Sequence, residues 1–280
     1  MGLLERICEP CRQNTCKRLF DRHRKMQQFA SEAQAAASVY DDAPGGSLRE
    51  ATDAELADLG LSRDFLEVLN DKDGDRTDFR AKMYVDKKTG ARMIAFRGTT
   101  SKQDWGQNAR QGVGVQSAYY TRAQQIAARV SASPKGNDIK FVGHSLGGGL
   151  ASAASRASGN PATTFNAAGL NPLTVLRGDK WKFDSPIEAV RVRGEILTSI
   201  QEDSAISLFA PDAAYSERFD IDPARGFGAQ QLRRVFNGQI VDAAKARLMR
   251  SVDLHGMDSV QASLKQDMND TVQALIDNGC

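Results

Sequence analysis

The stretch that decides the fold is Ile139-Lys140-Phe141-Val142-Gly143-His144-Ser145-Leu146-Gly147-Gly148-Gly149. Its apolar first half predicts a buried strand over 139–142, and the small residues that follow predict a helix over 146–157. The pattern Gly-x-Ser-x-Gly between them predicts a tight strand-to-helix turn that exposes the serine hydroxyl. Gly143 and Gly147 are expected there because a Cβ atom would clash with neighbouring backbone. We therefore predict Ser145 as a nucleophile, and the N–H of Leu146 as a donor to an oxyanion.

A serine nucleophile needs a base, and the chain has only three histidines. His144 adjoins the serine, so we expect its side chain to point to the other side of the turn. His23 precedes the whole predicted sheet. His255 remains, in a predicted loop before the last helix, which is where an α/β hydrolase places its base.

The third member of a catalytic triad is a carboxylate, expected between the serine and the histidine in chain order. Glu195 lies just past the predicted strand 188–193 and is the first choice. Asp203 is the alternative, since aspartate is commoner in this role. Either carboxylate would fix the tautomer of His255 and stabilise its protonated form.

Strands and helices alternate along the rest of the chain. The expected strands are 79–85, 92–96, 139–142, 162–166 and 188–193, and the expected helices are 27–39, 53–69, 117–132, 146–157 and 258–277. A hairpin turn at Lys87–Gly90 joins the first two strands. This alternation predicts an α/β fold with a mostly parallel sheet flanked by helices. We expect residues 71–280 to form an α/β-hydrolase domain, and residues 1–70 to form a helical N-terminal extension packed on it.

Two further motifs add a resemblance to a known family. Phe96-Arg97-Gly98-Thr99 ends a predicted strand, and Asp104-Trp105 follows it, upstream of Gly143–Gly148. With these motifs the chain resembles class 3 (fungal-type) lipases and related bacterial proteins over roughly residues 79–258. The resemblance implies an oxyanion donor at Thr99, and a mobile lid or rim over about 101–116, with Trp105 near the acyl channel. It implies hydrolysis of lipid acyl esters, with no cofactor and no metal.

The resemblance is incomplete in two respects. We expect neither the disulfides nor the signal peptide of secreted lipases in this chain, and the acid follows a glycine rather than an asparagine. Chains of this kind resemble antibacterial phospholipase effectors that are delivered by contact-dependent secretion systems. That resemblance implies synthesis in the cytoplasm, delivery to a target cell, and an immunity protein as a partner.

The composition excludes a wholly disordered chain and a collagen-like repeat protein. The 280 residues are 41% hydrophobic and 26% charged, with a net charge of +2, as in ordinary globular proteins. We expect no transmembrane anchor, because no stretch reaches about 18 consecutive apolar residues, and no nucleic acid partner. Residues 1–28 carry seven basic and three acidic side chains, and residues 225–250 carry six and one. A solvated helical face is the favoured reading of these segments. They also suit the approach to an anionic membrane surface, which high salt would weaken.

Cysteines cluster near the start of the chain. Cys8, Cys11 and Cys16, with His23, could bind zinc, or two of the three could form a disulfide. Reduced thiols without a role are the favoured reading, and Cys280 ends the chain. The stretch 71–75 is similar to a calcium loop, but its glycine comes too early, so an acidic turn is expected.

Two other functions stay open. The chain could be a small-molecule carboxylesterase or thioesterase that needs no lipid interface. It could also be a non-catalytic binding protein on a hydrolase fold, because a fold alone does not establish a function.

Overall fold

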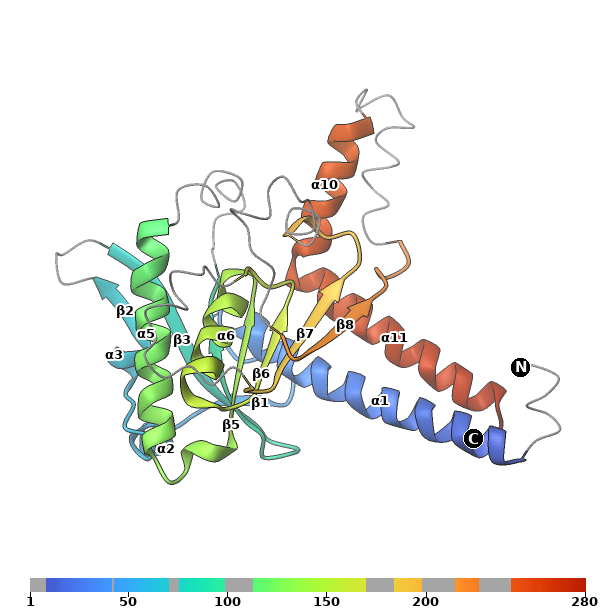
Figure 1. Cartoon of the computed structure of the whole chain (residues 1–280), viewed down its shortest axis with the longest axis horizontal. Coiled ribbons are helices and arrows are strands. Elements are labelled where there is room, and N and C mark those ends of the chain that lie inside the picture. The colour runs from blue at the N-terminus through green and yellow to red at the C-terminus, as the bar shows by residue number, and fades with distance from the viewer. Residues whose placement is uncertain are drawn as a thin grey trace.

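The computed structural model describes residues 9–41, 43–70, 76–98, 113–169, 184–197, 215–226 and 243–280 (Figure 1). An eight-stranded sheet lies at the centre of this part of the chain, in the order β1-β3-β4-β5-β6-β7-β8, with β2 paired to β3. The strands are β1 Leu48–Glu50, β2 Glu67–Asn70, β3 Arg76–Asp86, β4 Arg92–Phe96, β5 Ile139–His144, β6 Ala162–Phe165, β7 Ile187–Val192 and β8 Glu217–Ile221.

Strands β4 to β8 are all parallel, whereas β1, β2 and β4 pair antiparallel with β3. The mostly parallel α/β sheet expected from the sequence is therefore confirmed. The expected hairpin joins β3 to β4. Its turn is held by the Asp86 carboxylate, which accepts from the N–H of Lys88 at 2.8 Å.

Helices cover both faces of the sheet (Figure 1). They are α1 Glu9–Ser38, α2 Asp53–Ala57, α3 Arg63–Leu66, α5 Val113–Ala132, α6 Leu146–Ser158, α10 Ala243–His255 and α11 Met257–Asp277, with a 3₁₀ turn η1 at Gly136–Asp138. Alternate side chains of each strand enter two separate cores. Phe96 and Phe141 pack with α5 and α6, while Met93 and Val142 pack with α1 and α11.

The segment 53–69 differs from the single helix expected. Two short helices, α2 and α3, are followed directly by strand β2. Helix α2 has its own capping box between Thr52 and Glu55, and the chain then turns at Gly60, where φ is +66°. Ser62 starts α3 by capping the N–H of Phe65. Local capping thus divides a segment whose apolar spacing alone fits one helix.

Strand β8 and helix α10 were not expected from the sequence. Strand β8 lies at the edge of the sheet with mostly exposed residues, so its sequence lacks the apolar pattern of a buried strand. Helix α10 occupies the region expected to be a loop, and His255 is its last residue. The prediction of a loop histidine was therefore wrong, and the base candidate sits at a helix C-terminus.

Helices α1 and α11 lie side by side and extend well beyond the sheet (Figure 1). The Arg22 guanidinium on α1 binds the Asp267 carboxylate on α11, with Nε to Oδ1 at 2.9 Å. Because the far half of α11 extends beyond the sheet, Val272 is 40% exposed. Among the helices described, none combines the length and hydrophobicity needed to cross a bilayer.

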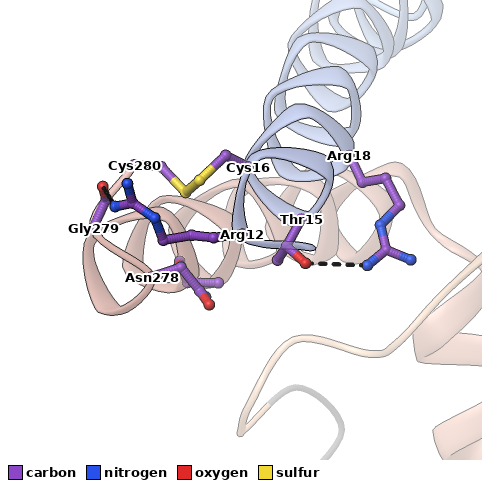
Figure 2. The surroundings of a disulfide bond; sticks show 8 residues. Arg12, Thr15, Cys16, Arg18, Asn278, Gly279 and Cys280 are labelled. Carbon is purple, nitrogen blue, oxygen red and sulfur yellow. Dashed lines mark hydrogen bonds between the residues drawn. A yellow bond between two sulfur atoms is a disulfide. The ribbon is translucent and has the colours of Figure 1, made fainter. Parts of the chain in front are cut away.

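A disulfide joins the far ends of these two helices. Cys16, near the start of α1, is bonded to Cys280, with their Cα atoms 5.6 Å apart (Figure 2). The expectations of a reduced Cys16 and of a chain without disulfides were therefore wrong. The pairing could not be read from local spacing, since the two cysteines are 264 residues apart and only the packing of α1 on α11 brings them together.

The basic surface of α1 is partly neutralised. Lys25 pairs with Glu188 on β7, Arg24 pairs with Asp21, and Arg22 pairs with Asp267. The second basic segment is described only in part, and there Arg225 pairs with Asp270 at 3.0 Å. The excess positive charge of these described surfaces is accordingly smaller than the sequence alone suggests.

Candidate active site

The turn after β5 has the strained geometry expected of a nucleophile elbow. Ser145 is the N-cap of α6, with φ 56° and ψ −126°, and its side chain makes no capping hydrogen bond. A Cβ atom on Gly143 would lie 2.1 Å from the carbonyl oxygen of Gly147, and one on Gly147 would lie 2.1 Å from that of Phe96. Both expected close approaches are confirmed. Leu146 is the first residue of α6, where the N–H has no partner within the helix.

Three neighbouring parallel strands end at the same edge of the sheet, where ligands bind in open α/β sheets. Ser145 follows β5, Asn166 follows β6, and Glu195 lies three residues past the end of β7. A turn at Gly194, with φ +81°, leads into Glu195. The sheet register therefore gathers residues that are far apart in the sequence.

Glu195 and His255 form a buried pair. The Nδ1–H of His255 donates to Oε2 of Glu195 over 2.7 Å, and both residues are almost fully shielded from solvent. The same oxygen accepts from the N–H of Leu197 at 2.8 Å, which fixes the carboxylate. With Nδ1 as the donor, the Nε2 atom of a neutral His255 is the proton acceptor.

His144 packs against His255, with ring centroids 4.8 Å apart. Its Nε2–H donates to the main-chain carbonyl of His255 over 2.7 Å. Burial, together with the neighbouring His255, lowers the pKa of His144 to about 3. His144 is therefore neutral near pH 7 and holds the main chain of His255, the candidate base, through this hydrogen bond.

Tyr40, just past the end of α1, continues this chain of hydrogen bonds. Its hydroxyl accepts from the N–H of Gly98 at 2.9 Å and lies 3.4 Å from Nδ1 of His144. Burial raises the pKa of Tyr40 to about 12, so the hydroxyl keeps its proton and donates a hydrogen bond to Nδ1 of His144. Gly98 directly precedes Thr99. The network thus connects the predicted oxyanion loop to the segment that bears His255.

Tyr40 and Asn166 were missed by the sequence analysis. Asn166 has φ 42°, one of two non-glycine residues with positive φ in the described chain, the other being Ser145. A polar residue directly after a buried strand is a signal that could have identified Asn166. Tyr40 gave no such signal, because its partners are 58 and 104 residues away.

Several predicted residues lie outside the described part of the chain. They are the oxyanion candidate Thr99, the alternative acid Asp203, Trp105 and residues 101–112 of the expected lid. Residues 113–116 belong to the first turn of α5. Cys16 cannot bind zinc while it is disulfide-bonded, and the described residues hold no group of three or more candidate metal ligands.

A known phospholipase is similar to this chain in sequence. An extracellular phospholipase A1 of Serratia liquefaciens is 37% identical over 142 residues, which cover 48% of this chain and 43% of that protein. The chain thus spans less than half of that relative's length.

Solved lipase structures are also similar. A triacylglycerol lipase of Penicillium expansum has a TM-score of 0.42 at 11% identity, over 72% of this chain and 79% of that one. Lip2 lipase of Yarrowia lipolytica has a TM-score of 0.40 at 15% identity, over 71% and 78%. A phospholipase-like family model, the Tle-like phospholipase domain, matches residues 31–232. Because that match spans most of the chain, this protein belongs to the family of Tle-like phospholipase domains.

Proposed function

We propose that this chain hydrolyses an acyl ester bond of a phospholipid through an acyl-enzyme on Ser145. The observation that carries the proposal is the 2.7 Å hydrogen bond from His255 Nδ1 to Glu195 Oε2 at the edge of the sheet where Ser145 occupies a strained turn. In this arrangement Ser145 is the nucleophile, His255 the general base and Glu195 the residue that orients the base. Membership in the family of Tle-like phospholipase domains supports ester hydrolysis as the class of reaction.

In the first half of the reaction the Ser145 Oγ attacks the ester carbonyl carbon while Nε2 of His255 takes the hydroxyl proton. The carbonyl oxygen becomes an oxyanion, which accepts from the N–H of Leu146 at the start of α6 and from that of Thr99. The positive end of the α6 dipole favours the same charge. When the intermediate collapses, His255 returns its proton to the departing alkoxide, and the lysophospholipid leaves.

In the second half a water molecule attacks the acyl-serine. His255 again accepts the proton, and the same N–H groups stabilise the second oxyanion. When this intermediate collapses, His255 returns its proton to Ser145 Oγ, which releases a fatty acid and the free Ser145 hydroxyl. Glu195 stays ionised throughout and stabilises the imidazolium each time it forms. No other group is needed to balance either step.

The test compares wild type, Ser145→Ala and Ser152→Ala on phospholipid vesicles and on a short-chain soluble ester. Ser152 is a buried serine of α6 whose hydroxyl bonds the carbonyl of Gly148, so it controls for loss of a serine in this helix. Loss of a nucleophile lowers turnover by about 10⁴–10⁶-fold. We expect this loss on vesicles for Ser145→Ala, and near wild-type turnover for Ser152→Ala.

Other outcomes would identify the alternatives. Serine-dependent activity on the soluble ester alone would indicate a carboxylesterase or thioesterase. No serine-dependent activity on either substrate would contradict the proposal and favour a binding protein. The chain position of the released fatty acid, read from a phospholipid with two different acyl chains, would give the acyl preference.

We infer further that the chain acts outside a reducing cytosol as a delivered antibacterial effector with a neutralising immunity protein. The Cys16–Cys280 disulfide supports this, because such bonds persist in oxidising compartments. The Serratia relative is named as extracellular. Directing the chain to the periplasm of a test bacterium should stop growth in a Ser145-dependent way, and the immunity protein should restore it. Equal growth with wild type and Ser145→Ala would contradict this role.

A further inference from the structure

The last main-chain carbonyls of helix α10 need hydrogen-bond partners from outside the helix. The last four carbonyls of an α-helix have no N–H partner within the helix. In α10 these include the carbonyls of Leu254 and His255, and Gly256 then separates α10 from α11. Because Leu254 and His255 are buried, water cannot easily satisfy these carbonyls.

The side chain of Asn166 caps both of them. Its Nδ2 donates to the carbonyl of Leu254 at 3.2 Å and to that of His255 at 2.9 Å. The His255 carbonyl also accepts from Nε2 of His144 at 2.7 Å. The buried side chains of His144, at the end of β5, and Asn166, just past the end of β6, therefore both bind the main-chain carbonyl of His255, the predicted base.

Asn166 is itself fixed to the strand that leads to Glu195. Its Oδ1 accepts from the N–H of Val192 at 2.9 Å, and its own N–H donates to the carbonyl of Val190 at 3.0 Å. Val192 is the last residue of β7, and its carbonyl accepts from the N–H of Glu195 at 3.2 Å. The fully buried side-chain amide of Asn166 thus connects strand β7, which leads to Glu195, to helix α10, which ends at His255.

The backbone of Asn166 suits only a few residue types. Its φ of 42° lies in the left-handed region, which asparagine, aspartate and glycine adopt most readily. Of these, only asparagine offers both a donor group for the two carbonyls and an acceptor for the Val192 N–H.

We propose that Asn166 is a positioning residue for His255. It holds the main chain of the base at a fixed place relative to Glu195, so that the imidazole keeps its Nδ1–H on the carboxylate and its Nε2 toward Ser145. This inference rests on the proposed function. Its consequence is that loss of the amide misplaces the base without changing the binding of substrate.

The chain offers a matched control at the other end of the same strand. Asn160 lies just before β6, is also buried, and donates through Nδ2 to two main-chain carbonyls, those of Gly136 at 2.7 Å and Ile139 at 3.0 Å. Asn160→Gly and Asn166→Gly therefore remove the same group, at opposite ends of β6. Glycine also accepts the backbone conformation of Asn166 without strain.

The experiment measures kcat, KM and thermal unfolding of the full chain for both variants. Asn166→Gly should lower kcat about 10²-fold with KM within about twofold, as expected for a base displaced by about 1 Å. Asn160→Gly should lower the melting temperature by a similar amount but leave kcat near the wild-type value. Equal kcat values in the two folded variants would overturn the proposal.

A second variant and a second readout complete the test. Asn166→Asp keeps an acceptor for Val192 but directs an oxygen at two carbonyl oxygens, so its kcat should fall at least as far as that of Asn166→Gly. Without substrate, the downfield NMR resonance of the His255 Nδ1–H should shift or broaden in both Asn166 variants and stay unchanged in Asn160→Gly. An unchanged resonance would overturn the proposal even if the chain had no esterase activity, whereas activity retained in Ser145→Ala would overturn the proposed function alone.

Discussion

Glu195 and His255 are 60 residues apart in the sequence, yet a single 2.7 Å hydrogen bond joins Oε2 of one to Nδ1 of the other. Both are buried, and the oxygen is also fixed by the Leu197 N–H. A solvated surface pair would have neither feature. The arrangement sets the tautomer of His255, which is the role of a triad acid.

Glu195→Gln should therefore lower kcat by about 10³–10⁴-fold with little change in KM, because the amide no longer stabilises the imidazolium. Steady-state hydrolysis of vesicles measures the effect. Asp203→Asn, which changes the alternative acid, is the control and should keep turnover within a few-fold of wild type. A greater loss in Asp203→Asn than in Glu195→Gln would assign the acid to Asp203.

Tyr40→Phe should affect both stability and activity. The variant leaves the Gly98 N–H without its acceptor, and an unsatisfied buried donor costs about 1–3 kcal/mol. It also loosens the loop that continues into Thr99, so we expect kcat to fall about 10-fold. Urea unfolding and vesicle hydrolysis measure the two effects. Tyr84→Phe, at another buried tyrosine, is the control, and an equal kcat in both variants would contradict the role of the Tyr40 hydroxyl.

His144 makes stability depend on pH. Its pKa in the folded chain is about 3, lowered by burial and by His255, whereas the ordinary pKa of a histidine, as in the unfolded chain, is 6.5. Between these values the unfolded chain binds the extra proton, so stability rises with pH and is lost as pH falls below about 6.5. The slope from this one group is about 1.4 kcal/mol per pH unit.

The measurement compares urea unfolding of wild type and His144→Asn from pH 7 to pH 4. Asparagine does not titrate and can still donate to the His255 carbonyl, so its stability should fall less steeply than that of wild type. Parallel curves for the two proteins would show that His144 does not stay neutral in the folded chain.

Reduction of the Cys16–Cys280 disulfide should destabilise the chain without inactivating it. The bond closes nearly the whole chain, and loss of such a cross-link costs about 2–5 kcal/mol. It joins the ends of α1 and α11 that extend beyond the sheet (Figure 1), whereas Ser145 follows strand β5 of the sheet. Thermal unfolding with and without a thiol reductant measures the effect. The double variant Cys16→Ser/Cys280→Ser should have the melting temperature of the wild type in reductant, and adding reductant should not change it. An unchanged melting temperature of the wild type in reductant would contradict the prediction.

Much of the fold could be predicted from the sequence, because buried parallel strands and a Gly-x-Ser-x-Gly turn leave strong local patterns. Strand β5, helix α6 and the β3–β4 hairpin were predicted in this way. Strand β8 was missed since an exposed edge strand needs few apolar residues. The break between α2 and α3 was missed because the caps at Thr52 and Ser62 outweighed the apolar spacing.

The candidate site could be predicted only where the chemistry restricts the residue type. Ser145 stands in a recognisable turn, and three histidines leave few choices of base. Asn166 and Tyr40 make hydrogen bonds to residues that are distant in the sequence, so their partners become visible only in three dimensions. The same is true of Cys16 and Cys280.

The central claim is that Ser145 carries the acyl group, and capture of that intermediate tests it most directly. The full chain is mixed with phospholipid vesicles, quenched in acid during the first turnover, digested and examined by mass spectrometry. We predict one acyl chain on the peptide that contains Ser145, and none on that peptide in Ser145→Ala. Release of fatty acid by wild type with no acyl group on Ser145, or undiminished release by Ser145→Ala, would contradict the account.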